Sequence, residues 1–325
     1  LYWIEEYHLD GLRLDAVDRI VDHRSPDILS ELAARVRAGP GAERPIHLVL
    51  ENDDNDAKRY RRDSSGRALE FAAQWNDDFH HACHALLTGE CDGPYADFAP
   101  AASADDKTGE PNGGRPIEHL ARALAQGFAY QGEPSRFRGG RERGSPSGML
   151  PPAAFVNFLQ NHDQAGNRAF GERLHQLIEA EAMDAALAIL LLAPTPPLLF
   201  MGQEFAASQP FLFFCDFGPE LAEAVRAGRR REFERSAHFA DPAALERIPD
   251  PNDPSTFACS TLDWGCLEQS AHRRALDLHR TLIALRRRVV TPLIARIDAG
   301  GHARTFARAG LAVRWRTDDG RFLDL

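Results

Sequence analysis

Lysine is scarce in this sequence. The 325 residues include only Lys58 and Lys107, so arginine carries nearly all of the positive charge. The arginines are scattered and form no cluster of the kind that binds phosphate groups. The formal net charge of −10 argues against a nucleic-acid backbone or an anionic membrane as a partner. Ordinary globular enzymes carry a similar charge, so the composition excludes partners without naming a substrate.

Cysteine patterns and long apolar runs are also missing. The five cysteines include no CxxC pair, and an odd number suits a reducing compartment, so we expect a cytoplasmic protein. Cys83 and His84 are adjacent, which is poor spacing for a metal site, and we expect a buried thiol at Cys83. We expect no metal or other cofactor. No apolar run reaches the roughly 20 residues that cross a bilayer, because prolines interrupt the nearest candidate at 185–201.

What the sequence does contain is an alternation of apolar runs and amphipathic stretches, which is typical of βα units and a parallel sheet. Strands are expected at 11–17, 46–50, 69–75, 155–159 and 197–201. Helices are expected at 26–38, 78–87, 117–130, 174–192 and 268–289, with polar loops at 89–115 and 131–152 and a long excursion at 205–254. Residues 303–306 and 311–315 alternate with period two, as antiparallel strands do.

The predicted fold is therefore the C-terminal part of a (β/α)8 TIM barrel, in the α/β class. About five βα units fill residues 1–292, where a closed barrel needs eight. Residues 293–325 are expected to begin a C-terminal β-domain. Because the chain starts at Leu1 without an initiator Met, we expect it to be a fragment whose first three barrel units precede Leu1.

Three of the expected strands end in a carboxylate, at Asp15, Glu51 and Asp163. In parallel barrels, catalytic residues project from the carboxyl ends of the strands. Glycoside cleavage needs two carboxyl groups, one to attack or stabilise the anomeric carbon and one to protonate the departing oxygen. The three strand-ending carboxylates supply the groups that such chemistry needs.

The neighbours of these carboxylates suggest separate roles. Arg13 and Asp15 lie two apart on a strand and face the same way, so the guanidinium would keep Asp15 ionised as a nucleophile. A structural ion pair is the alternative. Glu51 follows the apolar run 46–50, a setting that favours a protonated carboxyl and hence a general acid. His162 and Asp163 offer a donor and an acceptor to sugar hydroxyls, although an N-capping turn is equally open.

Residues 10–17 (DGLRLDAV), the strand-ending Glu51 and residues 161–163 (NHD) resemble, in order and spacing, the α-amylase family of glycoside hydrolases. The resemblance implies that Asp15 is the nucleophile, Glu51 the general acid/base, and Asp163 the carboxylate that grips the sugar hydroxyls. Arg13 and His162 match the family's supporting residues in the same sugar subsite.

Further stretches narrow the resemblance to those members that cut the α-1,4 bond next to the terminal trehalose unit of maltooligosyltrehalose. They are residues 74–81 (QWNDDFHH), 161–168 (NHDQAGNR), 200–205 (FMGQEF) and 211–217 (FLFFCDF). The expected partner is therefore an α-glucan oligosaccharide, and the expected substrate-binding residues are Arg13, Trp75, Asn76, Asp77, Asp78, His162 and Gln164. Trp75, with polar residues around it, is expected to stack on a glucose ring, and the aromatic cluster at 211–217 is a further candidate; burial in the core is the alternative for each.

Two other functions stay open. A glucan branching enzyme of the same family would transfer the cut chain rather than hydrolyse it, and Gln164 and the stretch 75–81 speak against it. A non-catalytic glucan-binding protein on a degenerate barrel is the second alternative, and the three carboxylates speak against it. A fragment of this kind is expected to be inactive alone.

Overall fold

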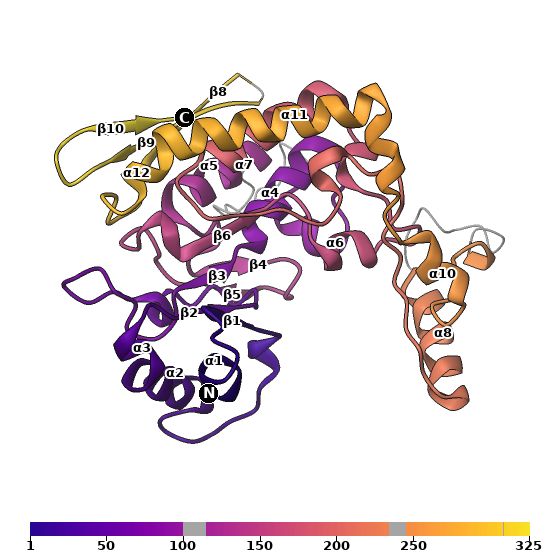
Figure 1. The fold of residues 1–325 in the computed structure, drawn as a ribbon, viewed down its shortest axis with the longest axis horizontal. Coiled ribbons are helices and arrows are strands. Elements are labelled where there is room, and N and C mark those ends of the chain that lie inside the picture. The colour runs from indigo at the N-terminus through magenta and orange to yellow at the C-terminus, as the bar shows by residue number, and fades with distance from the viewer. Residues whose placement is uncertain (100–114, 234–244, 308) are drawn as a thin grey trace. The chain divides into compact units, whose positions relative to one another are not determined.

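The computed structural model describes residues 1–99, 115–233, 245–307 and 309–325 (Figure 1). The chain forms two compact units, each built from separate stretches of sequence. The first contains residues 1–158, 189–197 and 285–325, and the second contains residues 159–188 and 198–284.

The first unit is built around a sheet of parallel strands that forms a half-barrel, as the sequence predicts. Its strand order is β1-β2-β3-β6-β7, and Figure 1 labels β1, β2, β3 and β6. The strands are β1 (Gly11–Leu14), β2 (His47–Leu50), β3 (Ala73–Trp75), β6 (Phe155–Phe158) and β7 (Pro197–Leu198). Each begins or ends within an expected strand, and most are shorter than expected.

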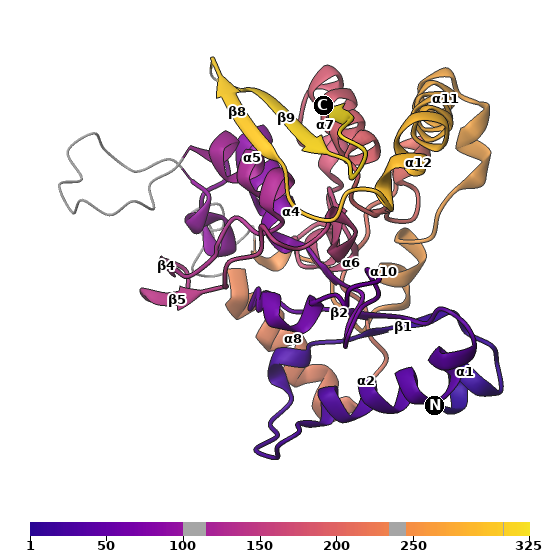
Figure 2. The same ribbon diagram turned by 90° about the vertical axis from the view of Figure 1, so that its left-hand side faces the viewer.

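Helix α2 (Ile28–Ala38) packs against the sheet, and Figure 2 shows it running along β1 and β2. Ala33 and Val36 share one core cluster with the buried side chains of β2. Each large apolar side chain buried here contributes roughly 1.5–3 kcal/mol. The helix starts at Ile28 because the Asp27 carboxylate caps it, accepting from the Ser30 amide. Its apolar stripe matches the expected one.

The remaining elements up to β6 surround the sheet with short helices and a hairpin. They are α1 (Tyr2–Glu5), η1 (Val17–Arg19), α3 (Pro40–Glu43), η2 (Ala57–Tyr60), α4 (Asp77–Thr88), η3 (Gly93–Asp97), α5 (Pro116–Gln126), β4 (Glu133–Ser135), β5 (Arg141–Arg143) and η4 (Pro152–Ala154). Helices α4 and α5 pack together. The antiparallel pair β4–β5 lies inside the expected loop at 131–152 and was not predicted.

The C-terminal stretch of the first unit is a π-helical turn (Arg286–Val290), helix α12 (Thr291–Ile294) and an antiparallel sheet. That sheet has the order β10-β9-β8, with β8 (His302–Phe306), β9 (Gly310–Arg316) and β10 (Phe322–Asp324). The two antiparallel strands expected here are confirmed. Strands β8 and β9 lie against α5 (Figure 2). A separate domain at 293–325 stays a prediction.

The second unit is mainly helical. Its elements are α6 (His162–Gly166), η5 (Leu174–Gln176), most of α7 (Ala180–Leu192), η6 (Gln203–Phe205), α8 (Pro219–Phe233), α10 (Pro254–Cys259), η8 (Trp264–Glu268) and nearly all of α11 (Ser270–Leu285). Residues 189–192 of α7 and Leu285 of α11 belong to the first unit. The expected helix at 174–192 is split into η5 and α7, and the expected one at 268–289 is split between α11 and its neighbours. The expected excursion at 205–254 contains α8. Among the described residues, no helix is long and apolar enough to span a membrane.

Candidate active site

The pairing register of the first unit brings three strand ends level. Leu14 pairs with Leu50 across β1 and β2, and Leu50 pairs with Gln74 across β2 and β3. The next residues along the chain are Asp15, Glu51 and Trp75. Parallel strands present their carboxyl ends at one edge of the sheet, so these three residues leave the sheet at adjacent positions.

Arg13 lies among all three. Its Nη1 is 2.5 Å from Oδ1 of Asp15, and its Nη2 is 3.7 Å from Oε2 of Glu51. The Cζ atom of Arg13 also lies 4.2 Å from the centre of the Trp75 ring, a cation–π distance. The expected Arg13–Asp15 pair is therefore present, and the same guanidinium reaches the second carboxylate.

The two carboxylates differ in exposure and in how firmly they are held. The Asp15 side chain is 75% exposed, whereas that of Glu51 is 20% exposed. The backbone N–H of Ala16 donates to Oε2 of Glu51 at 2.6 Å, and the Glu51 amide donates to the Leu14 carbonyl at 2.9 Å. Because Oε2 accepts from an amide, a proton on this carboxyl belongs on Oε1. The arrangement pairs an open carboxylate with an anchored one.

Trp75 and Asn76 end β3 in different ways. Trp75 is half-buried, with Arg13 over its ring and Phe158 edge-on at 6.0 Å between ring centres. Asn76 is fully buried, and its Nδ2 donates to the Gly127 carbonyl and to Oδ1 of Asn157, both at 2.9 Å. Trp75 can therefore contact a ligand, whereas Asn76 ties β3 to its neighbours.

Asp77 and Asp78 begin α4 in contrasting environments. Burial raises the pKa of Asp77 well above its ordinary value, and the nearby charges of Asp53 and Glu51 add to the rise against the opposing effect of Arg143. Asp77 thus lies within the electrostatic field of Glu51. The raised pKa favours the neutral form of the Asp77 carboxyl, which can donate a hydrogen bond.

Asp78, by contrast, is fully buried and bonded on both oxygens. Its Oδ2 accepts from the side chain of Asn55 at 2.9 Å and from the amides of Ala129 and Tyr130 at 2.8 and 2.9 Å. Its Oδ1 accepts from Nη2 of Arg143. These bonds occupy the carboxylate, so Asp78 faces the protein interior here rather than a ligand.

Arg143 is the functional-site neighbour that sequence reasoning missed. It lies on β5, inside a segment expected to be a loop, and is 4% exposed. Burial lowers the pKa of its guanidinium, but the charges of Asp78 and Asp53 outweigh this effect and the net shift is upward. No local pattern in the sequence links it to Asp53 or Asp78, which lie far earlier in the chain.

Asp163 belongs to the second unit, at the start of α6. The cap of this helix is Asn161, whose Oδ1 accepts from the Asp163 amide at 2.8 Å. The Oε1 of Gln164 accepts from the Asn161 amide at 3.0 Å, which completes a capping box. The Asp163 side chain remains 46% exposed, with Nε2 of His162 at 3.5 Å. A capping turn is thus present, but Asn161 forms it and leaves the Asp163 carboxylate open. The grouping of Asp163 with Asp15 and Glu51 stays a prediction.

The aromatic cluster at 211–217 also lies in the second unit. Phe213, Phe214 and Phe217 are exposed, and Arg229 lies over the Phe213 ring at 5.4 Å. Phe211 instead packs against Phe200 at 5.0 Å between ring centres. The cluster therefore divides into an inner ring and outer rings. Among the described residues, no group of three His, Cys, Asp or Glu side chains could hold a metal ion.

Comparison with known proteins gives the family. The chain is 42% identical over 318 residues to the malto-oligosyltrehalose trehalohydrolase of Rhizobium sp. (strain M-11), covering 96% of the chain and 48% of that protein. It is 42% identical over 312 residues to the enzyme of the same name from Arthrobacter ramosus, covering 94% and 50%. The chain belongs to the malto-oligosyltrehalose trehalohydrolase family. It spans about half the length of the curated relatives it matches.

Solved structures agree with this family. A Salmonella typhimurium protein provisionally described as an alpha amylase is 45% identical, with a TM-score of 0.88 over 99% of this chain and 51% of that one. The glycogen-degrading pneumococcal virulence factor SpuA is 15% identical with a TM-score of 0.53, over 99% of this chain and 32% of that one, and shares the fold. No family model matches the chain. The predicted membership of the α-amylase family of glycoside hydrolases is confirmed.

Proposed function

We propose that the protein hydrolyses the α-1,4 bond next to the terminal trehalose unit of maltooligosyltrehalose and releases trehalose, with retention of configuration. The observation that carries this proposal is the grouping of Arg13 with the carboxylates of Asp15 and Glu51 at neighbouring strand ends. The name shared by its relatives supports the choice of substrate.

Each carboxylate has one task in the proposed reaction. The Asp15 carboxylate attacks the anomeric carbon while Glu51 gives its proton to the departing glycosidic oxygen, which leaves as the trehalose hydroxyl. A glycosyl–Asp15 ester and an ionised Glu51 result. Glu51 then takes a proton from water as the water attacks the ester, which restores both carboxyl groups and frees the remaining glucan. The anchored Glu51 suits repeated proton transfer, and the exposed Asp15 suits attack on a ligand.

The substrate contacts are proposed from the same family pattern. Asp163 and His162 hold the hydroxyls of the reacting sugar, and Gln164 lies beside them on α6. Trp75 provides an apolar ring surface, and Asp77 offers a neutral carboxyl as a hydrogen-bond donor. Asn76 and Asp78 act behind these two residues, because both are fully buried: Nδ2 of Asn76 and both oxygens of Asp78 already bond to the protein.

The experiment is an assay of full-length protein with maltotriosyl trehalose, in which released trehalose is measured. Glu51→Gln should lower the rate about 10²–10⁴-fold, the usual effect of losing a positioned acid, and Asp15→Asn should abolish turnover. The matched control is Asp10→Asn, at the opposite end of β1, whose exposed carboxylate pairs with Arg44. That variant should retain activity.

The products distinguish the alternatives. New α-1,6 branches without trehalose would indicate a branching enzyme and overturn the proposal. Glucose or maltose in place of trehalose would keep the mechanism and overturn the substrate. Wild-type rates in either the Asp15 or the Glu51 variant would refute the assignment of the two carboxylates.

A further inference from the structure

The loop that follows Glu51 is fastened to the protein interior by a buried pair of opposite charges, Arg143 and Asp78. Both side chains are almost wholly inaccessible to solvent. Removing charges from water costs several kcal/mol per ion, and burying such a pair adds little net stability compared with apolar residues. Burial on this scale points to a role other than stability.

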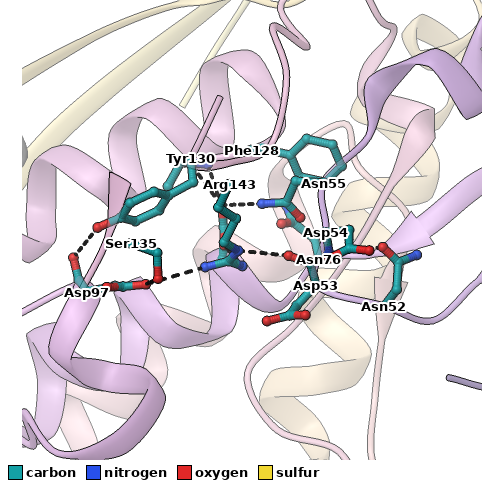
Figure 3. Close-up of polar contacts among 12 residues, drawn as sticks. Asn52, Asp53, Asp54, Asn55, Asn76, Asp97, Phe128, Tyr130, Ser135 and Arg143 are labelled. Atoms are coloured by element: carbon teal, nitrogen blue, oxygen red, sulfur yellow. Dashed lines mark hydrogen bonds and ion pairs between the residues drawn. The ribbon is translucent and has the colours of Figure 1, made fainter. Parts of the chain in front are cut away.

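The pair bonds to the loop at two places, and Figure 3 shows Arg143 together with the loop residues Asp53 and Asn55. The Nε of Arg143 donates to the backbone carbonyl of Asp53 at 2.7 Å, two residues after Glu51. The Asp78 carboxylate accepts from Nδ2 of Asn55 at 2.9 Å. Asn55 is fully buried and adopts a positive φ of 58°, a conformation that Asn tolerates better than most residues.

Asp78 and Arg143 are also held by residues outside the loop 52–55. The amides of Ala129 and Tyr130 donate to Asp78, and the Tyr130 hydroxyl donates to the Asp97 carbonyl at 2.8 Å. The Nη1 of Arg143 lies 3.9 Å from Oδ2 of Asp97. The guanidinium is therefore held on several sides by groups from α4, η3 and the chain after α5.

Glu51 is thus located from both directions along the backbone. On the strand side, its amide bonds to Leu14 and its Oε2 accepts from Ala16. On the loop side, the carbonyl of Asp53 is held by a charged donor, a stronger class of hydrogen bond than a neutral one. Arg143 itself contacts neither Glu51 nor Asp15 in any described interaction.

We propose that Arg143 is a positioning residue for Glu51: its pairing with Asp78 fixes the loop 52–55 and thereby the general acid. This inference rests on the proposed function. A positioning role predicts a rate loss that depends on the substrate, because a displaced acid slows only those reactions in which the leaving group must be protonated. A displacement of about 1 Å can cost about 10²-fold in rate.

The experiment compares two substrates in full-length protein. Maltotriosyl trehalose has a poor leaving group that needs a proton, whereas α-maltotriosyl fluoride has a leaving group that needs little help. The measured quantity is kcat/KM for each substrate, because it reports the first step, in which the bond to the leaving group is cleaved. Glu51→Gln defines the signature of a lost acid, namely a large loss with the oligosaccharide and a small one with the fluoride.

Arg143→Lys should show the same signature in weaker form. Lysine keeps the positive charge but cannot bond to Asp78 and to the Asp53 carbonyl with one planar fork. The expected loss is about 10–100-fold with the oligosaccharide and under about threefold with the fluoride. The matched control is Arg286→Lys, because Arg286 is another buried arginine that donates to backbone carbonyls, those of Leu191, Ala193 and Thr195. Its two losses should be equal.

Should Arg143→Lys fail to fold, Asn55→Gly tests the same loop anchor. Glycine accepts the positive φ but removes the side-chain bonds to Asp78 and from Gln74, without unpairing a buried charge. Equal losses on both substrates in the Arg143 and Asn55 variants, with the split retained in Glu51→Gln, would overturn the positioning role and leave the proposed function intact. No split in Glu51→Gln, or no fluoride release by the wild type, would instead count against the proposed function.

Discussion

Replacing Gly127 with alanine should be among the most destabilising single-methyl changes in the first unit. Gly127 ends α5 with φ of 92° and ψ of −70°, a conformation that L side chains rarely adopt. A Cβ atom at this position would lie 2.0, 2.3 and 2.4 Å from three atoms of the Phe155 ring. That ring is buried at the first position of β6, so it has little room to move.

The expected cost has two parts. Holding an alanine at positive φ costs about 1–2 kcal/mol. Forcing an extra carbon into a packed core costs typically about 1–3 kcal/mol. Gly127→Ala should therefore lower the free energy of unfolding by about 2–5 kcal/mol. The same change should disturb the site, because the Gly127 carbonyl accepts from Asn76 and the next residues hold Asp78.

Chemical denaturation followed by circular dichroism gives the free energy. Gly66→Ala is the matched control, since Gly66 also has positive φ, 80°, but a Cβ there meets nothing within 4 Å. The difference between the two variants isolates the clash. A double variant that adds Phe155→Leu should recover part of the loss by making room. If Gly127→Ala costs no more than Gly66→Ala, the reasoning from the Phe155 contact is refuted.

Three further predictions concern charge and stereochemistry. Because the pKa of Asp77 is raised by burial, its contribution to stability is present at low pH and lost as the pH rises; Asp77→Asn should therefore raise Tm at pH 7 and change it little near pH 3.5. Burial lowers the pKa of His175 to about 4, so the folded state resists a proton that the unfolded chain accepts, and stability should fall between about pH 6.5 and 4. His175→Gln should flatten that slope in thermal melts. Finally, NMR of the first sugar released from the glucan side should show the α-anomer, and an initial β-anomer would mean that Asp15 is not a nucleophile.

The sequence located the parallel strands and the candidate carboxylates because both follow from local pattern. The apolar run at 46–50 identifies β2, and Glu51 follows it directly. The strand expected at 69–75 was too long, because Leu69 and Phe71 bond back to the carbonyls of Arg61 and Arg59 instead. Such tertiary pairing leaves no periodic signal.

The buried charges were beyond sequence reasoning for a different reason. Arginine and aspartate are rarely buried, so Asp78 was assigned to substrate binding and Arg143 to a loop. The hairpin that carries Arg143 has only three residues on each strand, and most of them are charged or polar. The charge of Arg143 is balanced by the Asp78 carboxylate, which lies 65 residues earlier in the chain. Only the structure brings the two together.

The level pairing of the strand ends makes the strands of this sheet intolerant of new length. Inserting one residue between Gly11 and Asp15 would turn the following side chains to the opposite face of the strand, although the composition would hardly change. The turn at 63–67 is different, since its hydrogen bonds are local: the Asp63 carboxylate accepts from the backbone amides of Ser65 and Arg67. An insertion in that turn would disturb only these local bonds, whereas the strands must keep their residue count.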